Sequence, residues 1–141
     1  MKTLKLTSLF LVAIAMLMTT SCGKYEDGPA LSLLPKKTRL VGIWKVEKYV
    51  DADGTESTPA SGDNSTVEYV NDGKVIYIWS GGGFSQTTEG TWDFSDDKEN
   101  LEITFTAGSI SQTSSTKIVR LTNSELWLQD DNGDETHLIP A

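Results

Sequence analysis

The chain has 141 residues and one cysteine, Cys22, whose thiol could serve as a nucleophile, a metal ligand or an attachment point for acyl chains. Its position favours attachment. Residues 1–21 begin with a positively charged segment, continue with an apolar run over Leu6–Met18 and end in small residues, which are the three parts of a secretory signal peptide. The apolar run is shorter than the roughly 20 residues that a membrane crossing requires. We therefore expect export and removal of residues 1–21.

Other reactive side chains are scarce. The only histidine is His137, and no serine stands in a nucleophile elbow, so the sequence gives no catalytic site and predicts a protein that is not an enzyme. Two acidic segments, 51–56 and 130–135, supply several oxygens of the kind that Ca²⁺ binds. Neither has the spacing of an EF-hand loop, and Asp is common in turns. We therefore predict no metal site and no cofactor.

A cysteine directly after a signal-peptide cleavage site resembles the lipobox of bacterial lipoproteins. Thr19, three residues before Cys22, departs from the aliphatic residue usual in that family. The resemblance implies that Cys22 carries acyl chains such as palmitate, and that several chains hold the protein permanently in the outer membrane of a Gram-negative cell envelope. The alternative is a signal peptide with an incidental free thiol, which is open to oxidation.

Residues 22–36 are predicted to be the lipidated N-terminus and a linker, because Gly28-Pro29 and Pro35 discourage regular structure. Glu26-Asp27 is similar to tags that direct some lipoproteins to the cell surface, so the periplasmic and surface sides both stay open. Residues 37–141 have the length of one small domain. The net charge of −8 argues against nucleic acid as a partner. The sequence does not identify a protein partner.

From Leu40 onward, apolar and polar residues alternate with a period of two, which is typical of strands. No helix is predicted after the signal. The sequence favours a small all-β, eight-stranded antiparallel up-and-down barrel, with a sandwich as the alternative. The predicted strands are 41–50, 66–71, 74–80, 86–94, 100–107, 115–122, 125–129 and 135–139.

Two hairpin registers stay open. A two-residue turn at Asp72-Gly73 would place Val67 and Tyr69 on one face with Ile76 and Ile78. A three-residue turn with a bulge would instead align them with Val75, Tyr77 and Trp79. In the last hairpin, a three-residue turn aligns Leu126 and Leu128 with Leu138 and sends His137 outward, whereas a two-residue turn places His137 inside. The three-residue turn separates apolar from polar residues more cleanly between the two faces of the hairpin, and it therefore predicts an exposed His137.

Gly42-Ile43-Trp44, in the first predicted strand, matches the Gly-x-Trp signature of the lipocalin family, and about seven further strands follow. The segments Gly90–Phe94 and Leu121–Leu128 also look like lipocalin-like domains of small Gram-negative lipoproteins. The resemblance implies that Trp44 closes the floor of an eight-stranded barrel and that Gly42 permits close packing. The chain departs from larger lipocalins in having no C-terminal helix pattern and no disulfide.

A binding pocket inside the barrel is the strongest functional hypothesis, because eight-stranded barrels either fill with side chains or hold one small ligand. Aromatic residues expected to line it are Trp44, Tyr69, Tyr77, Trp79, Trp92 and Phe94. The glycine-rich segment 80–85 is expected to form a flexible lip at the mouth. The first hypothesis is therefore a tethered carrier or sensor for a small, mostly apolar ligand. The alternative is a solid barrel that acts as an interaction module for an envelope protein or surface glycan.

Overall fold

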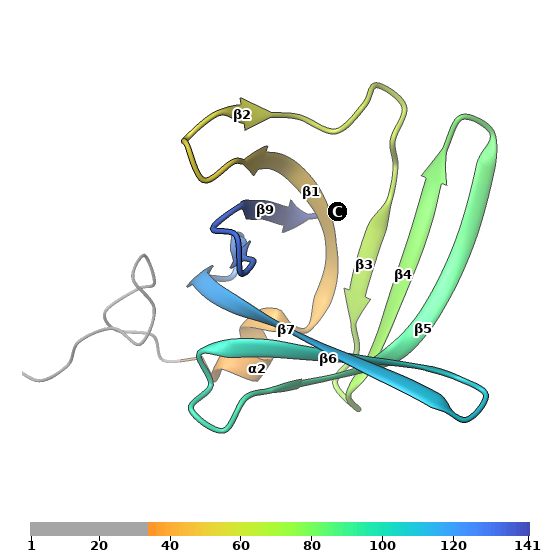
Figure 1. The fold of residues 1–141 in the computed structure, drawn as a ribbon, viewed down its shortest axis with the longest axis vertical. Coiled ribbons are helices and arrows are strands. Elements are labelled where there is room, and N and C mark those ends of the chain that lie inside the picture. Colours follow the sequence, from red (N-terminus) through yellow and green to blue (C-terminus); the bar gives the residue numbers. More distant parts are fainter. Residues whose placement is uncertain (1–33) are drawn as a thin grey trace, which may run out of the picture.

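The computed structural model describes residues 34–141, so the predicted signal peptide, Cys22 and most of the predicted linker lie outside the described residues. One short helix, α2 (Lys36–Leu40), precedes nine strands (Figure 1). The strands are β1 (Gly42–Val50), β2 (Glu56–Ser57), β3 (Thr66–Tyr69), β4 (Lys74–Gly81), β5 (Phe84–Phe94), β6 (Asn100–Ala107), β7 (Ile110–Leu121), β8 (Leu126–Gln129) and β9 (Glu135–Pro140). Residues 34–141 contain no helix with the length and hydropathy that a membrane crossing requires.

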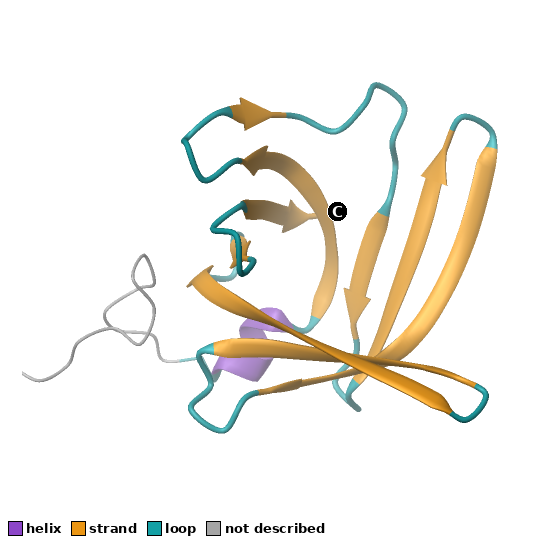
Figure 2. Cartoon of the chain, viewed as in Figure 1, coloured by secondary structure: helices purple, strands orange, loops and turns teal. Residues whose placement is uncertain are grey.

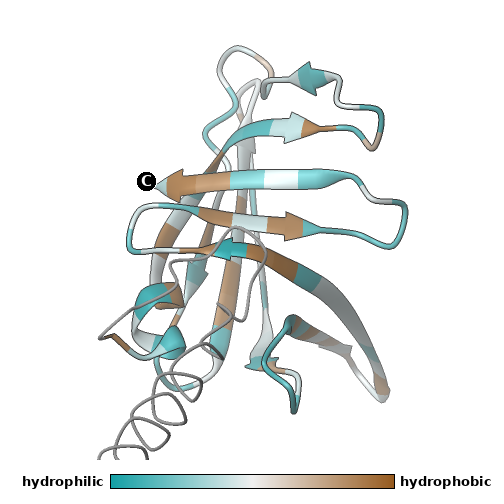
Figure 3. Cartoon of the chain, turned by 90° about the vertical axis from the view of Figure 1, so that its left-hand side faces the viewer, coloured by the Kyte–Doolittle hydropathy of each residue, from teal (hydrophilic) through white to brown (hydrophobic). Residues whose placement is uncertain are grey.

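Eight of these strands form a closed antiparallel barrel (Figure 2). From β3 to β9 each strand pairs with its neighbour in sequence, β1 pairs with β3, and β1 also pairs with β9 to close the sheet. Strand β2 is a two-residue addition on the end of β1. Apolar and polar residues alternate in short blocks along the strands (Figure 3), as expected where one face packs inward. The predicted eight-stranded barrel is confirmed.

The strand pairing decides both open registers. Tyr69 lies opposite Val75 and Val67 opposite Tyr77, so the inner face follows the register that lines the interior with aromatic rings. Leu126 lies opposite Leu138, which places His137 on the outer face beside Trp127. Its predicted exposure is wrong, because His137 is only 5% exposed. The imidazole stacks on the Trp127 ring with centroids 4.0 Å apart, and Nε2 lies 2.7 Å from the Glu135 carboxylate.

The absence of a helix was also a wrong prediction, because α2 covers one end of the barrel. Pro35 precedes its first residue, where a missing N–H costs nothing. Leu40, at the end of the helix, is fully buried in the core. Arg39 reaches from the helix to the end of β7, where its Nη1 donates a hydrogen bond to the Leu121 carbonyl at 2.6 Å. The helix therefore plugs this end of the barrel, which we call the closed end.

Within residues 34–141, no helix covers the opposite end of the barrel. Strands β5 and β6 pair only from Thr91–Phe94 to Leu101–Thr104, which is the half of each strand nearer the closed end. Beyond this pairing, the β4–β5 hairpin and the β6–β7 hairpin point in different directions (Figure 1). The β6–β7 hairpin is longer than predicted, because β7 begins at Ile110 and not at Ser115. We call this end of the barrel, where the two hairpins diverge, the open end.

Candidate functional site: the open end of the barrel

Several large apolar side chains on the strands that lead to the open end are not buried. Among the described residues, Tyr49, Trp79, Phe84 and Ile110 are 38%, 55%, 65% and 73% exposed. The register shows which way they face. On each of their strands they alternate with outward residues, and they lie opposite inner-face positions such as Thr136 and Gln86. They therefore belong to the inner surface of the barrel and yet contact solvent.

An aromatic row runs along this inner surface. The rings of Tyr77 and Trp79 stack with an interplanar angle of 15° and centroids 6.1 Å apart. Phe105, from the other hairpin, tilts against Tyr77 at 5.8 Å. Offset and tilted contacts of this kind are the favoured geometries of aromatic pairs. The row thus joins the two hairpins and ends in the half-exposed ring of Trp79.

The inner end of this row is anchored by a hydroxyl pair. Tyr69 is buried, and its hydroxyl is hydrogen-bonded to the hydroxyl of Tyr77. Burial, reinforced by the charge and hydrogen bond of Tyr77, raises the pKa of Tyr69 well above its usual value. Burial also raises the pKa of Tyr77. Both hydroxyls are therefore neutral at physiological pH and act as hydrogen-bonding groups.

Gly90 lies at the level where the two hairpins separate. A Cβ on Gly90 would lie 2.6 Å from the Thr104 carbonyl oxygen and 2.9 Å from the Phe105 ring. Because glycine has no side chain, β6 approaches β5 closely here and the Phe105 ring covers the glycine. Beyond this contact the strands no longer pair. The close approach therefore sets the base of the open end.

Several of the other inner positions near the open end are polar but uncharged. Gln86 lies opposite Trp79 and Thr88 opposite Tyr77, so an amide and a hydroxyl accompany the two rings. On the other hairpin, Gln112 lies opposite Phe105 and Ser114 opposite Ile103. The outer face of that hairpin carries hydroxyl pairs instead, including Thr104 with Thr113 at 2.7 Å. These pairs hold the hairpin together where no core lies beneath it.

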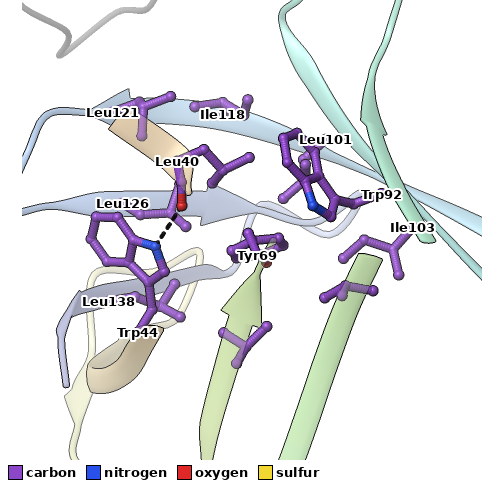
Figure 4. Close-up of a cluster of buried hydrophobic side chains, with 12 residues drawn as sticks. Leu40, Trp44, Tyr69, Trp92, Leu101, Ile103, Ile118, Leu121, Leu126 and Leu138 are labelled. Carbon is purple, nitrogen blue, oxygen red and sulfur yellow. Dashed lines mark hydrogen bonds between the residues drawn. The ribbon is translucent and has the colours of Figure 1, made fainter. Parts of the chain in front are cut away.

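The structure divides the six predicted lining residues into two groups. Tyr77 and Trp79 lie at the open end, as described above. Trp44, Tyr69, Trp92 and Phe94 pack toward the closed end. Trp44 donates its ring N–H to the Leu40 carbonyl at 2.8 Å (Figure 4), and Trp92 donates to the Val70 carbonyl at 3.0 Å. These two indoles have no N–H left for a ligand.

The closed end matches the role that the Gly-x-Trp resemblance implied for Trp44. The indole is buried and seals the floor together with Leu40 from α2. Gly42 adopts a φ of +149°, and a Cβ there would lie 4.0 Å from the Trp44 ring nitrogen. Any other residue at position 42 would be strained. The motif is therefore a structural feature of the floor.

A depression of about 400 Å³ also lies outside the closed end. Its lining includes Lys37, Asp72, Asp93 and Glu102, and the Lys37 ammonium lies 5.8 Å from the centroid of the Trp92 ring. The lining is mostly polar and charged, unlike that of the open end. Within residues 34–141, no three His, Cys, Asp or Glu side chains converge in a way that could hold a metal ion.

The outer face of the barrel carries a second ordered group. Arg120, Trp127, His137 and Lys48 lie opposite one another on four successive strands, β7, β8, β9 and β1. The Arg120 guanidinium lies 5.1 Å from the centroid of the Trp127 ring, which also stacks on His137. Glu125 and Glu56 pair with the two terminal cations. The row binds four strands together across the β1–β9 closure.

Sequence reasoning missed four residues of the open end, which are Tyr49, Phe84, Phe105 and Ile110. Phe84 lies within the predicted lip, and Ile110 lies between two predicted strands, so neither residue was assigned to a strand. The signal that could have found them is the two-residue glycine turns, Gly82-Gly83 and Gly108-Ser109, which extend both hairpins. The predicted lip at residues 80–85 lies at the mouth and contains the first of these tight turns.

Comparisons with known proteins agree with this geometry. The sequence model of the lipocalin-like domain family matches residues 40–128. No curated protein is significantly similar to the chain in sequence.

Solved structures show the same fold. A lipocalin-like protein from Bacteroides uniformis ATCC 8492 has a TM-score of 0.60 at 19% identity, with 73% of this chain and 99% of that chain covered. An uncharacterized protein from Bacteroides eggerthii DSM 20697 has a TM-score of 0.58 at 15% identity, with 72% and 99% covered. Insecticyanin from the tobacco hornworm Manduca sexta has a TM-score of 0.54 at 14% identity, with 83% and 65% covered.

The family match covers more than half of the chain, from the end of α2 through most of the barrel. The chain therefore belongs to the lipocalin-like domain family.

Proposed function

We propose that this protein is an envelope-anchored lipoprotein whose barrel binds a small, mostly apolar molecule through its open end, as a carrier or a sensor. One observation carries the proposal: large apolar side chains on the inner surface of the open end are exposed, although the same surface is densely packed at the closed end. Burying such side chains against a ligand is favourable by about 25 cal/mol for each Å² removed from water.

The shape of the barrel supports this proposal over a solid interaction module. One end is sealed by Leu40 and Trp44, so a ligand would enter from the other. Small-molecule sites are typically concave and mostly apolar, with a few polar groups that fix orientation. The aromatic row with Gln86 and Thr88 beside it has this composition. A solid barrel would be expected to fill these positions with contacts between side chains.

The anchor is part of the same proposal. Acylation of Cys22 would tether the domain to the outer membrane through the segment that precedes α2. Several acyl chains give stable attachment where a single chain gives only marginal binding. A tethered barrel would keep its ligand close to the membrane, on the periplasmic or the surface side.

Native mass spectrometry of the protein purified from its own cell envelope tests the proposal. We expect an additional mass that is reproducible, bound at one-to-one stoichiometry and released by organic solvent. A matched sample of the Trp79→Ala variant should lose this mass, because the exposed ring is part of the inner surface. Wild-type protein that is free of additional mass in every preparation would contradict the proposal.

A further inference from the structure

The inner surface of the barrel carries no charged side chain at any paired inner-face position of β3 to β9. This contrasts with a chain that contains 32 Asp, Glu, Lys and Arg residues. At the open end the inner positions are aromatic, aliphatic, amide, hydroxyl or glycine. A charged group that left water to enter this surface would find no opposite charge, and such a transfer is costly.

Neutral polar groups stand directly beside the aromatic rings. Trp79 is opposite Gln86 and Tyr77 is opposite Thr88, so the cross-strand neighbour of each aromatic residue carries a neutral hydrogen-bonding side chain. Tyr77 also contributes its hydroxyl, which burial keeps neutral. A molecule that stacked a flat ring on Trp79 could therefore hydrogen-bond to these groups through its own edge.

The loops around the open end carry carboxylates that repel anions. Asp53, Asp63 and Asp130 lie in loops that connect strands at this end, and their carboxylates accept hydrogen bonds from nearby backbone or side-chain groups. Hydrogen bonds to Thr55 and Ser65 lower the pKa of Asp53 and Asp63, so both are ionised at neutral pH. Their field repels an approaching anion. None of the three stands at a paired inner-face position, so a cation finds no carboxylate partner within the strands that line the mouth.

We infer that the open end selects an uncharged ligand that combines a flat ring with neutral hydrogen-bonding groups. The inference rests on the proposed function and narrows its ligand class. It concerns the side chains that line the mouth.

The test compares probes that share one ring system. They are N-phenyl-1-naphthylamine, its anionic counterpart 1-anilinonaphthalene-8-sulfonate, and a derivative of the neutral probe that carries a trimethylammonium group. Fluorescence titrations use the mature chain, residues 22–141, with Cys22→Ser to remove the acyl chains. We expect the neutral probe to bind about tenfold or more tightly than either ion, because neither ion finds a partner inside.

A positive charge placed on the inner surface should reduce the preference for the neutral probe over the sulfonate probe. Gln86→Lys, and independently Gln112→Lys, should strengthen binding of the sulfonate probe by about tenfold. Thr87→Lys is the matched control, because Thr87 adjoins Gln86 on the outer face and its replacement changes the net charge equally. Its sulfonate affinity should stay within about twofold of the starting protein. Circular dichroism verifies that each variant is folded.

The outcomes separate the two claims. Equal affinities for the three probes, or equal gains from Gln86→Lys and Thr87→Lys, would overturn the inference and leave the proposed function standing. No saturable binding of any probe by the folded protein would contradict the proposed function itself.

Discussion

The Phe105 ring lies over Gly90 at the level where β5 and β6 stop pairing, 2.9 Å from the position that a Cβ on the glycine would occupy. This contact links three features of the molecule. It allows the two strands to approach closely, it starts the divergence of the two hairpins, and it brings Phe105 against Tyr77.

Gly90→Ala should therefore destabilise the barrel by about 1–3 kcal/mol, because the added methyl meets a backbone carbonyl that cannot move alone. Urea unfolding followed by tryptophan fluorescence measures the change. Gly81→Ala is the control, since its methyl would find its nearest atom at 3.7 Å. Equal stability of the two variants would show that the close approach is not needed.

The hydrogen bond from Trp44 to Leu40 predicts that Trp44 contributes more to the free energy of unfolding than Trp79 does. Trp44→Phe should lower the free energy of unfolding by about 1–3 kcal/mol, because it leaves a buried carbonyl without its donor. Trp79→Phe should change it by less than about 0.5 kcal/mol, because that ring is exposed. Denaturant unfolding of both variants tests the asymmetry, and a larger loss for Trp79→Phe would contradict the assignment of Trp44 to the floor.

Tyr69 predicts a loss of stability in alkaline solution. Burial raises its folded-state pKa well above the usual 10.0, so the folded protein resists ionisation that the unfolded chain undergoes. The contribution of Tyr69 to stability is fully present below pH 10.0 and is lost as the pH rises from there toward the folded-state pKa. Tyr69→Phe should therefore show a smaller loss of stability above pH 10.0 than the wild type. Parallel curves for the two proteins in urea unfolding against pH would rule out this linkage.

Stacking between Trp127 on β8 and His137 on β9 predicts that the two side chains contribute to stability in a coupled way. The two rings lie 4.0 Å apart and nearly parallel, at 4°. A double-mutant cycle with Trp127→Ala and His137→Ala should give a coupling free energy of about 0.5–1.5 kcal/mol. Strictly additive losses would mean that the stack is a consequence of the register and does not itself stabilise it.

Cys22→Ser tests the proposed anchor separately from the barrel. The variant should fold with the circular dichroism spectrum of the wild type, fail to incorporate labelled palmitate and leave the membrane fraction. If the variant incorporates no labelled palmitate and yet stays in the membrane fraction, the protein is not anchored through Cys22.

Much of the barrel follows from local sequence patterns, and its exceptions have physical causes. The alternation around Leu101, Ile103 and Phe105 defines β6 because a half-buried strand requires it. The five-residue α2 has no periodic signal, since its place depends on burial of Leu40 against distant strands.

The site was harder to predict than the strands. Tyr77 and Trp79 were found once the aromatic register was allowed as an alternative, but their exposure follows from the divergence of two hairpins. That divergence depends on which strand packs over Gly90, a contact between residues far apart in the chain. The burial of His137 likewise depends on Trp127, Glu135 and the row across four strands.

The central claim is that the open end is the ligand site. Its most direct test is to measure the binding of N-phenyl-1-naphthylamine to variants at two adjacent positions. Trp79 and Ile78 are adjacent in β4 and both exposed, but Trp79 faces inward and Ile78 outward. Fluorescence titration should show that Trp79→Ala weakens binding by about tenfold, the loss of roughly 1.4 kcal/mol expected for one aromatic contact, while Ile78→Ala stays within about twofold of the wild type. Equal affinities for the two folded variants, or a larger loss for Ile78→Ala, would contradict a ligand site at the open end.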